Sequence, residues 1–124
     1  MQQHLFFDSH GQRVLAVLHP PTGSSRPGAL VFLHGWAGYR IGPHQMFTKI
    51  ARMASEMGFW SLRFDFRGRG DSQGDAAATT LSTMIEDARR AVEVVCEETG
   101  VERVALIGDG SGSEVAIGAA TLDP

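Results

Sequence analysis

Short apolar runs alternate along the chain with longer segments whose apolar residues recur at helical spacing. Two β-prone runs, residues 5–7 and 13–18, flank a turn signal at residues 8–11 and predict a β-hairpin. The nearly continuous apolar run at residues 29–34 predicts a strand that is buried on both faces. The segments 59–65 and 101–108 predict two further strands, the second of them buried.

Two segments between these strands carry an apolar stripe that predicts a helix. In residues 45–58, which end at Gly58, the stripe consists of Met46, Phe47, Ile50, Met53, Ala54 and Met57. In residues 79–100, which end at Gly100, it consists of Leu81, Met84, Ile85, Ala88, Val92, Val95 and Cys96. Cys96 is therefore expected to pack in the core rather than to act as a nucleophile.

Strands that alternate with helices of this length indicate an α/β fold. The predicted order is hairpin, strand, helix, strand, helix, strand, turn and the start of a helix. This order implies a doubly wound, mostly parallel sheet with right-handed crossovers and an N-terminal antiparallel hairpin. The last helix has run for about three turns where the sequence stops. We therefore expect residues 1–124 to be the N-terminal part of a single domain, truncated from a longer protein.

The stretch GDGSGS, residues 108–113, is compatible with a nucleophile elbow. This motif, G-x-S-x-G, bends so sharply that the residues two before and two after the nucleophile must be small. Gly108 and Gly112 meet this requirement if Gly110 occupies the nucleophile position. Centred on Ser111, the motif would place Asp109 in a tight position where it fits poorly. The pattern favours Gly110, which has no nucleophilic side chain, and leaves Ser111 as the alternative nucleophile.

The same stretch is also compatible with a nucleotide-binding turn, G-x-G-x-x-G, in which Ser113 replaces the third glycine. That motif normally lies in the first βα unit, with an acidic residue about 20 positions further on. Here the turn follows the last predicted strand. A nucleotide-binding turn is therefore a functional hypothesis, but one that ranks below the nucleophile elbow.

The loop LHGWAG, residues 33–38, follows the first predicted parallel strand. Acyl transfer requires two N–H donors aimed at the carbonyl oxygen as it becomes an oxyanion. His34 and Gly35 would let the backbone turn so that the N–H of Trp36 points inward, and the N–H of Ser111 would be the second donor. The alternative is that His34 and Gly35 only end a strand.

The chain contains, in this order, the stretches LVFLHGWAGYRIGPHQMF, LRFDFRGRGDSQG and VALIGDGSGSEVA. Together they resemble the N-terminal half of an α/β-hydrolase, of the serine-aminopeptidase-like and esterase-like branch. The resemblance extends over roughly residues 5–122. It implies hydrolysis of a small-molecule ester, in preference to an amide, through an acyl-enzyme, without a metal or organic cofactor.

The resemblance also implies where the site lies. The nucleophile belongs at position 110 and the oxyanion donors are the N–H groups of Trp36 and Ser111. The site loops contain His34, Gly35, Gly38, Gly108 and Gly112. Tyr39 and His44 follow the first of these loops and are candidate substrate-binding residues, although a structural or capping role is the alternative for His44.

The chain departs from the family pattern in two ways. Position 110 is glycine where the family has serine or cysteine, and all five histidines precede the elbow, whereas the family's acid and histidine follow it. The second functional hypothesis is therefore a non-catalytic fragment or pseudo-enzyme that acts as a binding module.

Three further predictions concern polar residues outside the elbow. Asp65, Arg67 and Asp71 are expected to hold their loop by hydrogen bonds, with substrate contact as the alternative. The side chain of Asp109 is expected to accept hydrogen bonds from nearby backbone N–H groups. Residues 86–90 are expected to form a solvated helix face with a charge pair four residues apart.

The composition is that of an ordinary globular domain, with 43% hydrophobic and 20% charged residues. The formal charge of −3 argues against a nucleic-acid partner, and one cysteine excludes an internal disulfide and the usual zinc clusters. The N-terminus does not resemble a signal peptide, and no apolar run approaches the roughly 18–20 residues of a membrane span. We expect a soluble, cytoplasmic protein that does not bind membranes; the sequence leaves its oligomeric state open.

Overall fold

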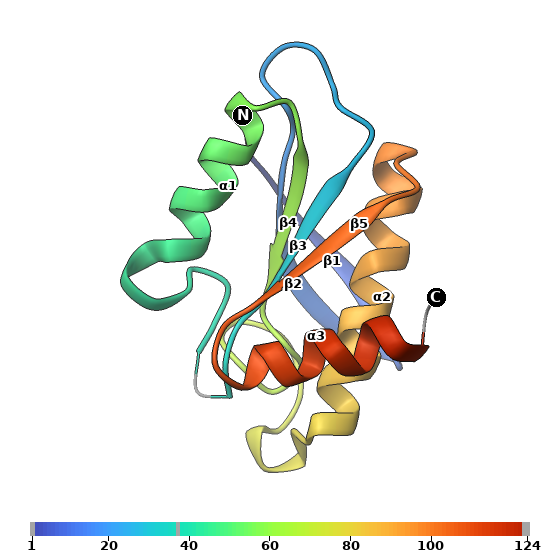
Figure 1. The fold of residues 1–124 in the computed structure, drawn as a ribbon. Helices are drawn as coiled ribbons and strands as arrows, with labels where there is room; N and C mark the ends of the chain where they lie inside the picture. The colour runs from blue at the N-terminus through green and yellow to red at the C-terminus, as the bar shows by residue number, and fades with distance from the viewer. Residues whose placement is uncertain (1, 37, 123–124) are drawn as a thin grey trace.

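The computed structural model describes residues 2–36 and 38–122, which form one sheet with helices on both faces (Figure 1). The strands are β1 (Gln3–Ser9), β2 (Gln12–His19), β3 (Ala29–Leu33), β4 (Trp60–Phe64) and β5 (Val104–Gly108). The helices are α1 (Met46–Glu56), α2 (Leu81–Thr99) and α3 (Ser111–Leu122), and two short 3-10 turns are η1 (Pro43–Gln45) and η2 (Ala76–Ala78). The predicted α/β order and the approximate bounds of its elements are confirmed.

The strand order in the sheet is β1-β2-β4-β3-β5. The hairpin strands β1 and β2 pair antiparallel, and β2 continues antiparallel onto β4. Strand β3 runs parallel to both β4 and β5, and Leu33 pairs with Gly108 at the end of each strand. The loops that follow β3 and β5 therefore leave the sheet side by side at its carboxyl edge, where α/β sheets place their ligands.

Two groups of buried side chains hold the layers together. The larger lies between the sheet and helices α2 and α3, and includes Val31, Leu33 and Met84. The smaller joins Phe32 of β3 to Phe47 of α1, whose ring centroids are 5.1 Å apart. Successive side chains of β3 thus pack on opposite faces of the sheet, as expected for a strand that is buried on both sides.

The stripe predicted for α1 is partly wrong. The buried side of this helix is formed by Phe47, Ala51 and Ala54, whereas Met53 and Met57 are 60% and 58% exposed. At 3.6 residues per turn Met53 lies about 120° around the helix from Phe47. The apolar stripe in the sequence was broader than the strip of helix surface that reaches the sheet.

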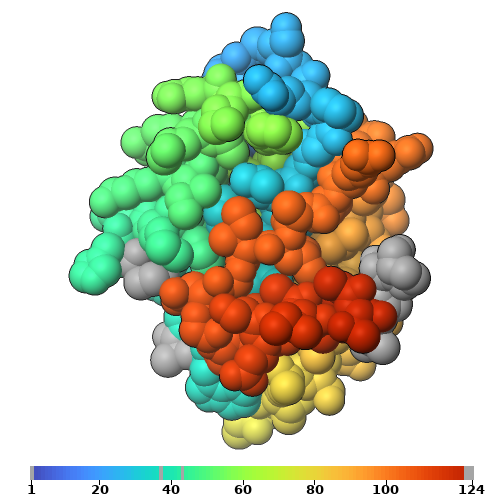
Figure 2. Space-filling view, in the orientation of Figure 1, coloured from blue at the N-terminus to red at the C-terminus, as the bar shows by residue number. Residues whose placement is uncertain are grey.

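The prediction that residues 101–108 form a buried strand is only partly right, because β5 is half-buried at Val104 and Leu106. Strand β5 pairs only with β3 within the described residues, and Ala105 is exposed. Figure 2 shows residues of β5, in orange, at the surface between α1 and α3.

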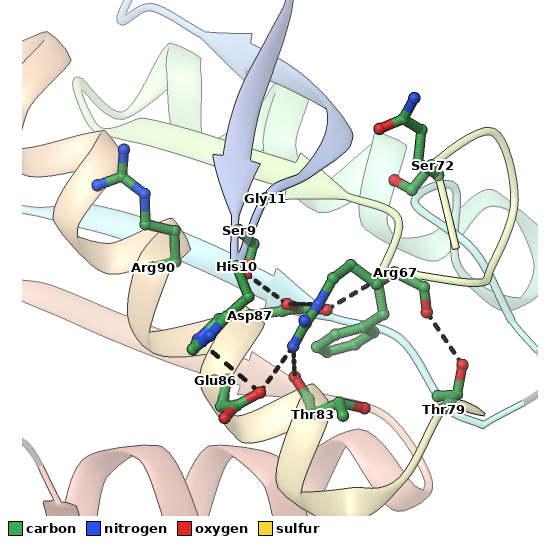
Figure 3. A network of polar contacts seen from close by, with 12 residues as sticks. Ser9, His10, Gly11, Arg67, Ser72, Thr79, Thr83, Glu86, Asp87 and Arg90 are labelled. Atoms are coloured by element: carbon green, nitrogen blue, oxygen red, sulfur yellow. Dashed lines mark hydrogen bonds and ion pairs between the residues drawn. The ribbon is translucent and has the colours of Figure 1, made fainter. Parts of the chain in front are cut away.

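A buried polar network joins the loop after β4 to α2 and to the hairpin (Figure 3). Asp87, which is 1% exposed, accepts hydrogen bonds from Ser9 Oγ at 2.7 Å, Arg67 N at 2.9 Å and Arg67 Nε at 2.6 Å. Glu86 accepts from Arg67 Nη2 at 2.8 Å. The prediction of a solvated face over residues 86–90 is therefore wrong at Asp87. Hydrogen bonds from Arg67, which lies in a distant loop, offset the free-energy cost of burying the Asp87 carboxylate.

Candidate active site

The loops that follow β3 and β5 meet in a pocket of about 480 Å³. The N–H of Asp109 donates to the carbonyl of Leu33 at 3.1 Å, so pairing between the two strands continues into the loops. The pocket is lined by His34, Gly35, Trp36, Gly38, Tyr39, Gly42, Asp109, Gly110 and Ser111. Two segments about 75 positions apart in the sequence thus form one concave surface.

Three glycines shape the turn between β5 and α3. A Cβ on Gly108 would overlap the carbonyl of Gly112, and a Cβ on Gly112 would overlap the carbonyl of Leu33. Gly110 has φ of +58°, and a Cβ built there would have no heavy atom within 4 Å. The turn is therefore closed to side chains at positions 108 and 112 and open at position 110.

His34 orients the backbone of the loop after β3. Its ring is buried, and Nε2 accepts the N–H of Phe66 at 3.2 Å. The proton must then be on Nδ1, which donates to the carbonyl of Gly35 at 2.7 Å. Burial lowers the pKa of His34, so the neutral ring with this tautomer is favoured. Because both ring nitrogens are engaged, His34 is not placed to act as a general base.

The carbonyl of Gly35 also accepts the N–H of Gly38 at 3.0 Å, so two donors hold it in one direction. In a trans peptide the following N–H points the opposite way. That N–H belongs to Trp36, and it donates to Ser111 Oγ at 2.7 Å. The Trp36 N–H is thereby directed at the first residue of α3, beside Gly110.

The far end of the same loop is tied to the loop after β4. Asp65 is fully buried and accepts hydrogen bonds from Arg40 N and Arg40 Nη1, both at 2.7 Å, and from Asp71 N at 2.9 Å. Asp71 pairs in turn with Arg40 at 3.2 Å. The prediction that Asp65, Arg67 and Asp71 hold their loop by hydrogen bonds is confirmed. Nothing in the sequence indicated that Arg40 takes part in this network.

The structure brings some predicted substrate-binding residues to the pocket and not others. Tyr39 lines the pocket and is 45% exposed. His44 is exposed in η1, immediately before α1, and does not line the pocket. The Asp109 carboxylate does not accept the expected hydrogen bonds from backbone N–H groups within the described residues, so that prediction is wrong. The backbone N–H of Asp109 donates to Leu33 and its carbonyl accepts from the N–H of Gly112 instead.

Arg69 lies beside the pocket and was not singled out from the sequence. Its guanidinium covers the indole of Trp36, with Cζ 5.1 Å from the ring centroid. Its signal in the sequence was its position in the RGRGDS loop, for whose polar residues Asp65, Arg67 and Asp71 substrate contact was the alternative role. A stack between residues 33 positions apart cannot be read from a linear pattern.

Within residues 2–36 and 38–122 no group of three or more histidine, cysteine, aspartate and glutamate side chains could hold a metal ion. In the same part of the chain no helix is both long and apolar enough to span a membrane.

The fold, together with a glycine-walled turn and a pocket at the carboxyl edge, defines an α/β hydrolase. Residues 24–124 match the serine aminopeptidase family S33. The chain belongs to this family, as the resemblance predicted.

Individual relatives agree with this assignment. Lysophosphatidylserine lipase ABHD12 of Gallus gallus is 33% identical over 94 residues, which are 76% of this chain and 23% of that protein. Esterase EstD of Thermotoga maritima is 32% identical over 97 residues, which are 75% of this chain and 24% of that protein. The chain thus spans about a quarter of the length of these relatives.

Among solved structures, Est1E from Butyrivibrio proteoclasticus with bound ferulic acid superposes on the chain with a TM-score of 0.85. The two sequences are 22% identical, and the match covers 96% of this chain and 47% of that chain. At this identity the likeness shows a shared fold.

Proposed function

We propose that this chain carries the nucleophile and oxyanion-binding positions of a carboxylic ester hydrolase. Position 110 is the nucleophile position, and the N–H groups of Trp36 and Ser111 are the oxyanion donors. The observation that carries the proposal is the backbone at Gly110, which turns with φ of +58° into α3 and leaves room for a side chain beside the pocket.

The contacts around this position support the proposed chemistry. A nucleophilic atom at position 110 would attack the ester carbonyl and form an acyl-enzyme while the alcohol leaves. The Trp36 N–H, already directed at the start of α3, and the N-terminus of that helix would stabilise the negative charge on the carbonyl oxygen. Glycine supplies no nucleophilic atom, so the chain as it stands binds an ester without being acylated at position 110.

The relatives guide the choice of substrate class. Two of them are named as a lipase and an esterase. We carry the ester class over to this chain, with a small-molecule or lipid ester as the substrate. The pocket of about 480 Å³ is large enough to hold a short acyl chain together with part of the alcohol.

A Gly110→Cys variant tests the proposal without requiring a histidine base. A thiol is intrinsically nucleophilic, and a helix N-terminus lowers its pKa. With p-nitrophenyl butyrate, the thiolate sulfur would bond to the acyl carbon and nitrophenolate would leave. We expect a burst of one nitrophenolate per chain and a butyryl group at position 110, measured by absorbance and by mass spectrometry.

Ser113→Cys is the matched control, because Ser113 is exposed in the first turn of α3 but does not line the pocket. Acylation of Gly110→Cys at the same rate as Ser113→Cys would show that the oxyanion donors do not act at position 110. Acylation of Ser111 in the unmutated chain would move the nucleophile to that residue.

A second candidate function is acyl-ligand binding without turnover. The absence of a side chain at Gly110 favours it, since the pocket and its N–H donors remain while the nucleophile is missing. Calorimetric titration of the unmutated chain with octanoate tests this candidate. Binding that Gly110→Leu abolishes would support it, because the larger side chain would project from position 110 into the pocket.

A further inference from the structure

Arg69 is a cation at the edge of the pocket that does not belong to the networks described above. Its guanidinium lies over the indole of Trp36, which is 47% exposed and lines the pocket. Stacking of this kind holds the planar guanidinium in a fixed orientation and leaves the edge with its N–H groups available for further contacts.

In the part of the chain that the structure describes, no carboxylate forms an ion pair with Arg69. Ion pairs in the described residues engage Arg40 with Asp65 and Arg67 with Asp87, but none involves Arg69. The Nε of Arg69 is shielded from solvent and has no hydrogen-bond partner within residues 2–36 and 38–122. A partly shielded, unpaired guanidinium attracts anions more strongly than one in a salt bridge.

The field of Arg69 reaches the wall of the pocket. Burial is the main cause of the lowered pKa of His34; the hydrogen bond to Gly35 and the charge of Asp65 act in the opposite direction, and the charge of Arg69 lowers this pKa as well. Because His34 is neutral, it does not screen this charge. The ionisable carboxylate among the lining residues is Asp109, which belongs to the other loop.

We propose that Arg69 is a specificity-determining residue that selects esters carrying an anionic group, either a carboxylate or a phosphate, near the acyl carbonyl. The proposal rests on the ester site argued above. Arg69 would donate two N–H bonds to the anion while the acyl carbonyl lies at the Trp36 N–H. The stack on Trp36 reduces the conformational entropy that a free arginine would lose on binding.

Binding to the unmutated chain tests the proposal, because Gly110 cannot be acylated. The probes are three octanoyl esters that share one acyl chain: neutral octanoylglycerol, octanoylglycerol phosphate and octanoylglycerol hemisuccinate. Their affinities are measured by calorimetry below the concentrations at which they form micelles. We expect at least one anionic ester to bind about tenfold more tightly than the neutral ester, as a charge-assisted hydrogen bond would give. Preference for one of the two identifies phosphate or carboxylate as the recognised group.

Three variants separate the role of Arg69 from a general charge effect. Arg69→Gln should remove the preference by weakening the anionic esters about tenfold more than octanoylglycerol, while Arg69→Lys should retain part of the preference. Arg103→Gln makes the same change in net charge next to the amino end of β5, away from the pocket, and should keep the full preference.

The outcomes distinguish this proposal from the ester site on which it rests. An anionic preference that survives in Arg69→Gln, or equal binding of all three esters by the unmutated chain, would overturn the assignment of Arg69 alone. Failure of all three esters to bind would overturn both the assignment and the proposed ester site.

Discussion

The backbone N–H of Trp36 donates to the hydroxyl oxygen of Ser111 at 2.7 Å, and this hydrogen bond joins the loop after β3 to the first residue of α3. If the Trp36 N–H is an oxyanion donor, as we propose, the hydroxyl of Ser111 occupies it when no substrate is bound. An acyl carbonyl oxygen would then have to displace that hydroxyl.

Removing the hydroxyl should therefore favour acylation. We predict that Ser111→Ala, introduced together with Gly110→Cys, raises the rate of acylation by p-nitrophenyl butyrate about fivefold, the equivalent of one net hydrogen bond of about 1 kcal/mol. The rate of nitrophenolate release measures it. Ser113→Ala, which removes a neighbouring exposed hydroxyl, is the control and should leave the rate unchanged. A slower reaction in Ser111→Ala would show that the hydroxyl assists the donor instead of blocking it.

The three glycines of the turn should respond differently to alanine. At Gly108 and Gly112 a Cβ would overlap a backbone carbonyl, so we expect each substitution to reduce the free energy of unfolding by roughly 3 kcal/mol. At Gly110 the space is open and the cost is that of a left-handed backbone, about 1–2 kcal/mol. Urea denaturation of the three variants measures these differences. Equal losses at all three positions would contradict the register of the turn.

The ion pair between Arg67 and Asp87 should contribute more to stability than the pair between Arg67 and Glu86. Asp87 is 1% exposed, whereas the side chain of Glu86 is 44% exposed. We predict that Asp87→Asn lowers the free energy of unfolding by about 3 kcal/mol, because Arg67 then loses a buried carboxylate. Glu86→Gln, the matched control, should cost less than about 1 kcal/mol, as solvent-exposed pairs do. Chemical denaturation compares the two, and a larger loss in Glu86→Gln would refute the assignment.

His19 should make the stability of the protein depend on pH. Its buried ring accepts a hydrogen bond from Arg63 Nε at 2.9 Å. Burial, followed by the charges of Arg63 and Arg52, lowers the pKa of His19 from 6.5 to about 4. Between these values the unfolded chain binds a proton that the folded chain does not. The contribution of His19 is therefore present above pH 6.5 and is lost as the pH falls towards about 4.

Thermal denaturation across that range measures the effect. In His19→Gln the amide oxygen can still accept from Arg63 but does not titrate, so we expect its melting temperature to fall less over the same interval. An equally steep fall in both proteins would attribute the pH dependence to other groups.

The order of strands and helices was predictable because it depends on periodicity within single segments. The apolar run ending at Leu33 and the stripe through Met84, Ala88 and Val95 each carry their own signal. The glycines at 108 and 112 were likewise predictable, since a sharp turn excludes a Cβ wherever the rest of the chain lies. The exposure of Met53 and of Ala105 was not, because it depends on which surfaces the neighbouring elements cover.

The partners of most polar side chains could not be predicted for the same reason. Asp87 looked like a residue of a solvated helix face until Arg67, 20 positions earlier, was found to pair with it. The direction of the Trp36 N–H depends on a carbonyl held by His34, and the His34 tautomer depends in turn on Phe66. Each of these contacts joins separate segments, and a linear pattern records none of them.

The local sequence thus specified the elements, the glycine turn and the family, because backbone sterics and apolar periodicity act over a few residues. Tertiary structure alone decided that β3 and β5 lie side by side, which brings Trp36 to Ser111, and that the loop after β4 places Arg69 on the indole of Trp36. The physical reason is that hydrogen bonds and charge interactions require atoms only a few ångströms apart. Which atoms meet at that distance is set by the packing of the whole sheet and its helices.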